Sequence, residues 1–173
     1  MSEFRHQHKG ISAEVNARID EFQASLPEKY VSIIGLAESF GINVYRADLP
    51  AEISGAIYKE GDQYVICSNK REPKARRRFT YAHELAHYLL HRADIGNGIN
   101  ENTLFRGSLS NDKEIEANKL AADILMPMPM IDKLVAAERH SIVEIAHIFG
   151  VSVSALLVRL GIPEGHVFDK REI

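Results

Sequence analysis

The chain has 173 residues, of which 45% are hydrophobic and 26% charged, and its net charge is −3. These proportions are ordinary for a globular protein and exclude a disordered, fibrous or strongly basic nucleic-acid-binding chain. No apolar run approaches the roughly 18–20 residues of a membrane-spanning helix, the polar N-terminus offers no secretory signal, and a single cysteine excludes an internal disulfide framework.

The first half of the chain is predicted to combine helices with a few strands. Apolar residues at helical spacing indicate the helices, and β-branched and aromatic residues indicate the strands. Gly41 ends one helix, and Pro73 suits the first turn of another. These signals predict, in chain order, a flexible start at 1–10, helices over 11–22 and 31–40, strands at 42–45, 56–58 and 64–67, and a helix over 73–91.

The second half is predicted to be helical after a loop at 92–112, which is rich in Gly, Asn and Ser. The expected helices run from about 111 to just before Pro127, and over 131–139, 141–149 and 152–160. The last two resemble a helix-turn-helix, but the second of them offers only Arg159 for reading base edges. We therefore interpret this pair as core packing and expect no sequence-specific DNA binding.

His83 and His87 are four residues apart, which on a helix places them one turn apart on the same face. At that separation both imidazoles can bind one cation of the size of Zn²⁺. Glu84 lies at the edge of this face, where its carboxylate can take a proton from water at the metal without competing as a ligand. This zincin arrangement, H-E-x-x-H, predicts one catalytic zinc ion, with Glu84 as the general base.

A catalytic zinc ion needs a third protein ligand, and the residues directly after the motif do not supply one. A metzincin would have a histidine at position 93, where this chain has Ala93. His91 continues the spacing of the motif, but it lies roughly 12 Å along the helix axis from His83. We interpret His91 as a packing or supporting residue.

The helix expected from about residue 111 supplies glutamates for the third position. Glu114 is our preferred ligand, and Asn118, one turn later, can hold a ligand through its amide. Glu116 is the alternative ligand, although it faces about 200° away from Glu114 on a helix. Glu114 can also be explained without a metal, as part of a capping box with Asn111.

Four segments in combination are more specific than H-E-x-x-H alone: RFT at 78–80, HELAHYLLH at 83–91, E-x-E-A-N at 114–118 and AA-x-x-LMP at 121–127. With them the chain resembles the ImmA/IrrE family of metallo-endopeptidases over roughly residues 30–160. The resemblance implies that His83, His87 and Glu114 bind zinc and that Glu84 is the catalytic base. Members of this family typically cleave helix-turn-helix repressors of phage, mobile-element or stress-response genes.

We therefore expect an α+β fold, in which a mostly helical zincin-like metallopeptidase domain carries a small antiparallel β-sheet and a C-terminal helix-turn-helix-like helical pair. We divide the chain into a flexible N-terminus at 1–10, the peptidase domain at 11–126 and a C-terminal helical segment at 127–173 packed on it. The helix over 73–91 would lie against the sheet, which would form one wall of a substrate cleft. Three side chains are candidates, by proximity alone, for stabilising the oxyanion of the reaction: Tyr81, Tyr88 and His91.

The function expected from these features is that of a cytoplasmic zinc metalloprotease that cleaves a specific helix-turn-helix repressor and so derepresses its genes. A non-catalytic metal-binding regulator, which would keep the ligands without needing Glu84, is one alternative. A DNA-binding regulator is another. The basic run at 70–78 is either a solvated helix start or, with the loop at 92–112, a docking surface for the partner.

Overall fold

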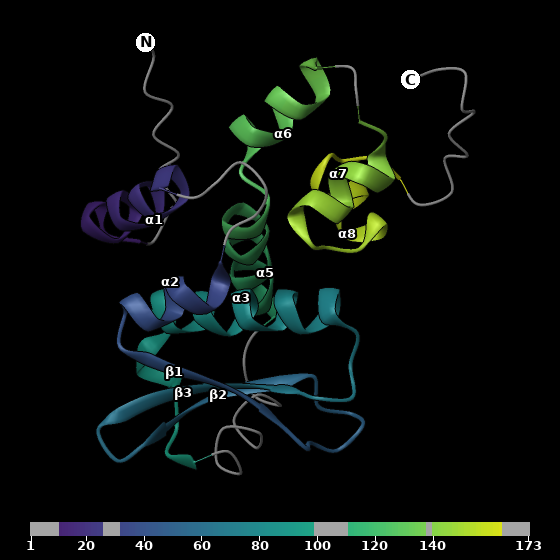
Figure 1. The fold of residues 1–173 in the computed structure, drawn as a ribbon. Helices are drawn as coiled ribbons and strands as arrows, with labels where there is room; N and C mark the ends of the chain where they lie inside the picture. The colour runs from purple at the N-terminus through teal and green to yellow at the C-terminus, as the bar shows by residue number, and fades with distance from the viewer. Residues whose placement is uncertain (1–10, 26–31, 99–110, 138–139, 164–173) are drawn as a thin grey trace.

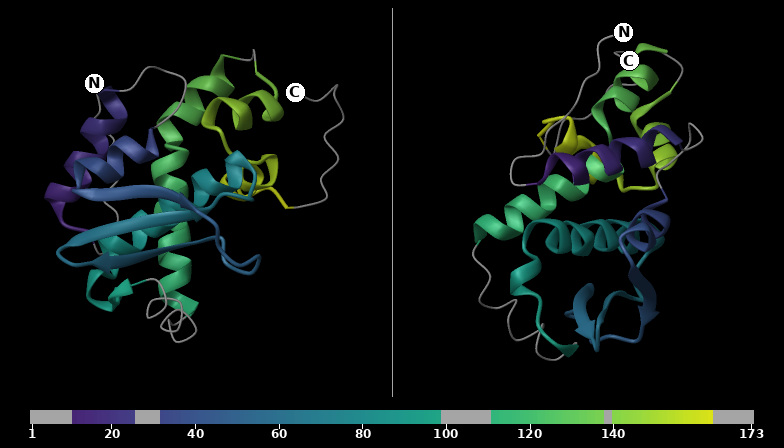
Figure 2. Two further views of the ribbon diagram at one scale, coloured as in Figure 1. Left: turned by 60° about the horizontal axis from the view of Figure 1, so that its bottom comes forward. Right: turned by 90° about the vertical axis from the view of Figure 1, so that its left-hand side faces the viewer.

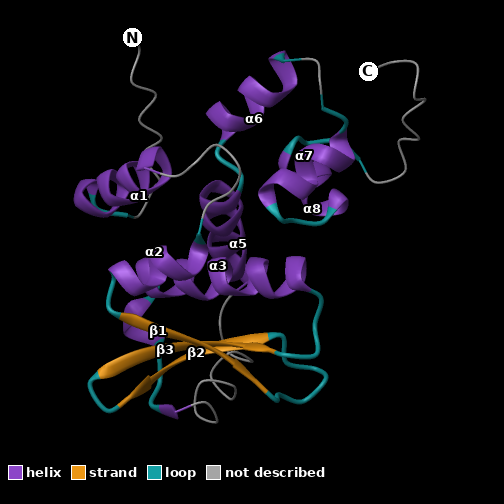
Figure 3. Cartoon of the chain, viewed as in Figure 1, coloured by secondary structure: helices purple, strands orange, loops and turns teal. Residues whose placement is uncertain are grey.

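The computed structural model describes residues 11–25, 32–98, 111–137 and 140–163. Its elements are, in chain order, α1 (Ala13–Ser25), α2 (Ile33–Ser39), β1 (Ile42–Ala47), β2 (Gly55–Glu60), β3 (Gln63–Asn69), α3 (Lys74–Leu90), the 3-10 turn η1 (Arg92–Asp94), α5 (Asn111–Leu125), α6 (Met128–Ala136), α7 (Ile142–Phe149) and α8 (Val153–Arg159). A small sheet forms one side of the molecule, α2 and α3 cover one of its faces, and the other α-helices lie beyond α3 (Figures 1 and 3). The mostly helical α+β class is confirmed.

Strand β3 is the centre of the sheet, whose strand order is β1-β3-β2. Strands β2 and β3 form an antiparallel hairpin that starts from the pair Glu60 and Gln63, whereas β1 runs parallel to β3. The sheet is therefore mixed, and the expectation that it is antiparallel throughout was wrong. The reason is the connection at 48–54, which leads from β1 across the position of β3 to the far edge of the sheet. Strand β2 runs back along that edge, and β3 then fills the central position in the same direction as β1.

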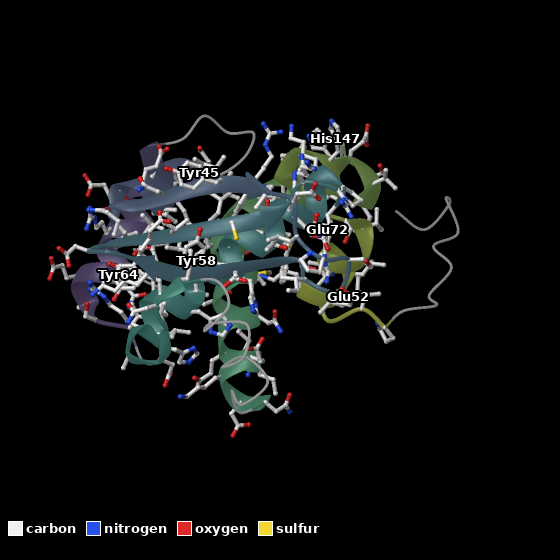
Figure 4. All side chains as sticks on the ribbon, turned by 90° about the horizontal axis from the view of Figure 1, so that it is seen from below. Tyr45, Glu52, Tyr58, Tyr64, Glu72 and His147 are labelled. Atoms are coloured by element: carbon white, nitrogen blue, oxygen red, sulfur yellow. The ribbon has the colours of Figure 1, made fainter. Side chains whose placement is uncertain are left out.

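The connection from β1 to β2 is held by Asn69 at the end of β3. The Asn69 side-chain amide donates hydrogen bonds to the carbonyls of Leu49, Pro50 and Ile53 at 3.1, 3.1 and 3.0 Å. Leu49 and Ile53 then pack on the outer face of the sheet against the buried Cys67. Figure 4 looks onto this outer face, with Tyr45 and Tyr58 labelled. One polar side chain thus stabilises the crossover that makes the sheet mixed.

Helix α3 lies between the sheet and α5, and it contacts β2 and β3 on one side and α5 on the other (Figure 2). Its side chains at Ala82, Leu85 and Ala86 are completely buried. The largest buried side chains around it come from both layers: Ile42, Ile57, Ile66, Ile124, Leu125 and Phe149. Burial of these apolar groups fixes the helix that carries the predicted motif.

The sheet approaches α3 closely at Gly55. A Cβ atom at this position would lie 2.3 Å from Thr80 Cγ2 and 2.5 Å from the Cys67 carbonyl oxygen. Both separations are far inside van der Waals contact, so glycine is required here by the close approach of α3 on one side and of the neighbouring strand β3 on the other.

The C-terminal helices α7 and α8 form a bent pair, as predicted. Ser141 and Glu144 make a capping box at the start of α7, and the hydrogen bond from the Ser141 backbone N–H lowers the pKa of Glu144. Gly150 ends the helix with a φ of 65°, in the left-handed region. Among the described helices no single one has the length and hydropathy needed to cross a membrane. Only α7 and α8 taken together reach that composition, and a 98° bend separates them.

Two arginines join this pair to the rest of the fold. Arg78 Nε at the start of α3 donates to the Phe149 carbonyl at 2.9 Å. Arg159 pairs with Asp123, and its Nε donates to the Met126 carbonyl at 3.2 Å. The pair therefore packs on α3 and α5, and the domain division at 126/127 stays a prediction.

Candidate metal centre

Helix α3 presents His83 and His87 toward α5. Their Nε2 atoms lie 3.0 Å apart, and their rings are in edge contact at 4.6 Å between centroids. The side chain of His83 is 14% exposed and that of His87 only 3%. The pair therefore sits at the boundary between the helix interface and solvent, with one ring reachable from outside.

Glu114, in the first turn of α5, lies against both histidines. Its Oε2 is 3.3 Å from His83 Nε2, and its Oε1 is 3.3 Å from His87 Nε2. Histidine, cysteine, aspartate and glutamate side chains can bind a metal ion. Across the part of the chain that the structure describes, these three residues form the one group of three or more such side chains whose ligand atoms lie within 4.8 Å of one another. The packing of α5 on α3 thus brings together the three residues that the sequence indicated as metal ligands.

The spacing of these ligand atoms fits a zinc ion. Tetrahedral coordination with Zn–N distances of about 2.0–2.1 Å separates two ligand nitrogens by about 3.3–3.4 Å. The corresponding separations here are 3.0 Å between the nitrogens and 3.3 Å from each nitrogen to the carboxylate, which is close to this tetrahedral spacing. Two imidazoles and one carboxylate also leave the fourth position open, which is typical of catalytic rather than structural sites.

Glu84 stands directly after His83 on α3 and is buried, with 1% of its surface exposed. A carboxylate in this position is shielded from bulk solvent, which strengthens its electrostatic interactions. Its role as general base stays a prediction.

Two further predicted residues contact the histidines from their outer sides. Asn118 Oδ1 lies 3.0 Å from His83 Nδ1, and His91 Nδ1 lies 3.1 Å from His87 Nδ1. Glu116 does not join the ligand cluster, because its Oε2 is 3.1 Å from His91 Nε2. From the sequence, Glu116 was predicted only as an alternative metal ligand, and its contact with His91 was not predicted.

The structure does not bring Tyr81 or Tyr88 to the metal centre. The Tyr81 hydroxyl donates to the Tyr45 carbonyl of β1 at 3.2 Å. Tyr88 packs edge-on against Tyr64 at 4.9 Å, and the Arg92 guanidinium lies over both rings. A hydrogen bond to the Tyr64 hydroxyl raises the pKa of Arg92. Both tyrosines therefore connect α3 to the sheet.

Most of the basic run at 70–78 has local partners. Lys70 and Arg71 pair with Asp48 at 3.0 and 2.7 Å, and Arg77 donates to the Glu72 carbonyl. These contacts favour the solvated helix start over a docking surface. Most of the expected loop at 92–112, and the expected flexible start at 1–10, lie outside the described residues.

Comparisons with known proteins relate this chain to one family and to solved structures. The family described as Peptidase_M78, IrrE N-terminal-like domain, matches residues 37–161, more than half of the chain. No curated protein gives a significant match. A solved structure described as a Mycobacterium tuberculosis transcriptional regulator superposes with a TM-score of 0.59 at 20% identity, over 93% of this chain and 50% of that chain. This chain thus spans half the length of that structure, and the likeness shows a shared fold.

Proposed function

Because the chain belongs to the Peptidase_M78 family of metallopeptidases, in agreement with the resemblance noted in the sequence, we propose that it is a zinc-dependent endopeptidase that cleaves a helix-turn-helix repressor. The observation that carries the proposal is the convergence of His83, His87 and Glu114 from two helices. Cleavage of such a repressor would separate DNA binding from dimerisation and so derepress genes of a phage, a mobile element or a stress response.

The proposed chemistry assigns one task to each residue. A zinc ion held by the three ligands would supply Lewis-acid polarisation of the peptide carbonyl and make water a better nucleophile near neutral pH. Glu84 takes the proton from the attacking water and returns it to the leaving amine. Its place beside His83 and its burial, with 1% of its surface exposed, support this assignment, because a buried carboxylate interacts more strongly with nearby charges than an exposed one.

The proposed substrate class rests on the family. A structural neighbour described as a transcriptional regulator fits a regulatory setting, but that description concerns the other protein. The engagement of Arg159 by Asp123 argues against the DNA-binding alternative, since the one base-reading side chain expected on α8 already has a partner within the fold.

The test is to mix the purified protein with any helix-turn-helix repressor that is encoded beside its gene. We expect one discrete cut that needs zinc, stops with a chelator and is absent with Glu84→Gln. Tight binding of an intact repressor, with release from DNA and no cut, would support a non-catalytic regulator instead.

A further inference from the structure

The two predicted histidine ligands are each contacted at the ring nitrogen that points away from the cluster. His83 Nδ1 faces Asn118 at 3.0 Å, and His87 Nδ1 faces His91 at 3.1 Å, while both Nε2 atoms face each other and Glu114. Three residues outside the ligand set therefore form a second layer: Asn118, His91 and, through His91, Glu116.

We propose that this second layer fixes the tautomer of both ligands, and that Glu116 and His91 are positioning residues for His87. The inference rests on the proposed zinc site, but it concerns side chains that do not touch the metal. It gives Glu116 a defined role as the outer end of a hydrogen-bonded chain from His87 through His91.

The direction of each hydrogen bond follows from its end groups. Asn118 Oδ1 is an acceptor only, so His83 must carry its proton on Nδ1 and keep the Nε2 lone pair free. At the other end the Glu116 carboxylate is also an acceptor, so His91 carries its proton on Nε2. His91 Nδ1 then has a lone pair and accepts the proton that His87 carries on Nδ1.

The hydrogen bonds behind His83 and those behind His87 therefore have the same result: each ligand keeps a lone pair on its Nε2. These lone pairs point toward each other across 3.0 Å, with a carboxylate 3.3 Å from each. Such a concentration of acceptors favours a cation between them, and partners of this kind typically orient metal-binding histidines.

The hydrogen-bonded contacts behind His83 and behind His87 differ in burial. Their removal should therefore weaken zinc binding to different extents. His87 and His91 are 3% and 7% exposed at their side chains, so their contact is shielded from water. A hydrogen bond of this kind, left unmade in a buried place, is not replaced by solvent. Asn118 is exposed, so water can replace it at His83.

The first experiment measures zinc affinity by competition with a chromogenic chelator. Removal of supporting residues typically weakens metal binding about 10–100-fold, and we expect His91→Ala to fall in this range. We expect Glu116→Ala to weaken it only about three- to tenfold, because the carboxylate is 61% exposed.

Conservative variants separate positioning from packing. Gln at position 91 can still accept from His87 Nδ1, and Gln at position 116 can still accept from His91 Nε2. His91→Gln and Glu116→Gln should therefore recover most of the affinity lost in the alanine variants. Asp112→Asn, which removes one carboxylate from the same face of α5, is the charge control and should bind zinc as the wild type does.

The second experiment uses the wild-type protein, so it does not depend on how a variant folds. Long-range ¹H–¹⁵N NMR of the zinc-loaded protein should show His83 and His87 protonated at Nδ1 and bound through Nε2. Binding of His87 through Nδ1, or unchanged zinc affinity in His91→Ala, would overturn the inference. A wild-type protein that binds no zinc would instead overturn the proposed function.

Discussion

Removal of Glu114 tests the metal centre most directly, because it supplies both carboxylate oxygens 3.3 Å from the histidine nitrogens. Zinc sites with four ligands bind with about 10–16 kcal/mol at pH 7, or about 2.5–4 kcal/mol per ligand. Loss of one ligand is therefore expected to raise the zinc Kd about 10²- to 10³-fold in Glu114→Ala.

Thermal unfolding with and without zinc reports this change in affinity as a shift in melting temperature. At free zinc about 100 times the wild-type Kd, binding stabilises the wild type by about 2.7 kcal/mol, which is about 5–11 °C for a domain of this size. At the same zinc concentration Glu114→Ala gains less than about 0.5 kcal/mol, or under about 2 °C. Scans in chelator supply the metal-free reference for each variant.

The matched control is Asp112→Ala, which shortens another acidic side chain in the first turn of α5. It should show the full wild-type zinc shift. A full shift in Glu114→Ala, together with its loss in Glu116→Ala, would reverse the ligand assignment and refute the reasoning from the measured distances.

Three further predictions concern the general base Glu84, the ion pair between Arg159 and Asp123, and the stability of the fold at low pH. Glu84→Gln should retain zinc but lose repressor cleavage about 10²- to 10⁴-fold, measured on gels beside metal analysis. Arg159→Ala should lower the free energy of unfolding in urea by about 1–3 kcal/mol, because the partly buried Asp123 carboxylate loses its ion pair with Arg159, and it should leave DNA retention unchanged. A hydrogen bond from Lys70 lowers the pKa of Asp48. This carboxylate therefore stabilises the fold above its unfolded pKa, and the contribution is lost as the pH falls through the lower folded value. Asp48→Asn should accordingly flatten the stability–pH curve below about pH 4.

The helices and strands were largely predictable because their signals are local. Spacing of apolar residues located α3 and α5, and the hairpin turn at 60–62 followed from a glycine between two β-rich runs. Helix α6 starts at Met128, before the predicted 131. Pro129 is tolerated in the first turn because backbone N–H groups there have no partner within the helix. The parallel pairing of β1 was not predictable, since it depends on a crossover held by Asn69 from a distant part of the chain.

The candidate site shows the same division between local and distant information. His83 and His87 were indicated by their spacing on one helix, and Glu114 by the face it shares with Asn118; their roles stay predictions, although the structure brings them together. Tyr81 lies two residues before His83, about 200° round the helix, so helical geometry alone separates it from the ligands. The contact of Glu116 with His91 depends on how α5 crosses α3, which no local pattern encodes.

The absence of space beside Gly55 limits how this protein can diverge. Exchange of Thr80 for serine would remove the methyl group 2.3 Å from the missing Cβ, but the Cys67 oxygen at 2.5 Å belongs to the backbone and cannot be substituted away. A side chain at position 55 would therefore require the backbone of β2 to move away from β3 at this point. Mutagenesis libraries should therefore retain glycine at this position, even where they vary the residues around it.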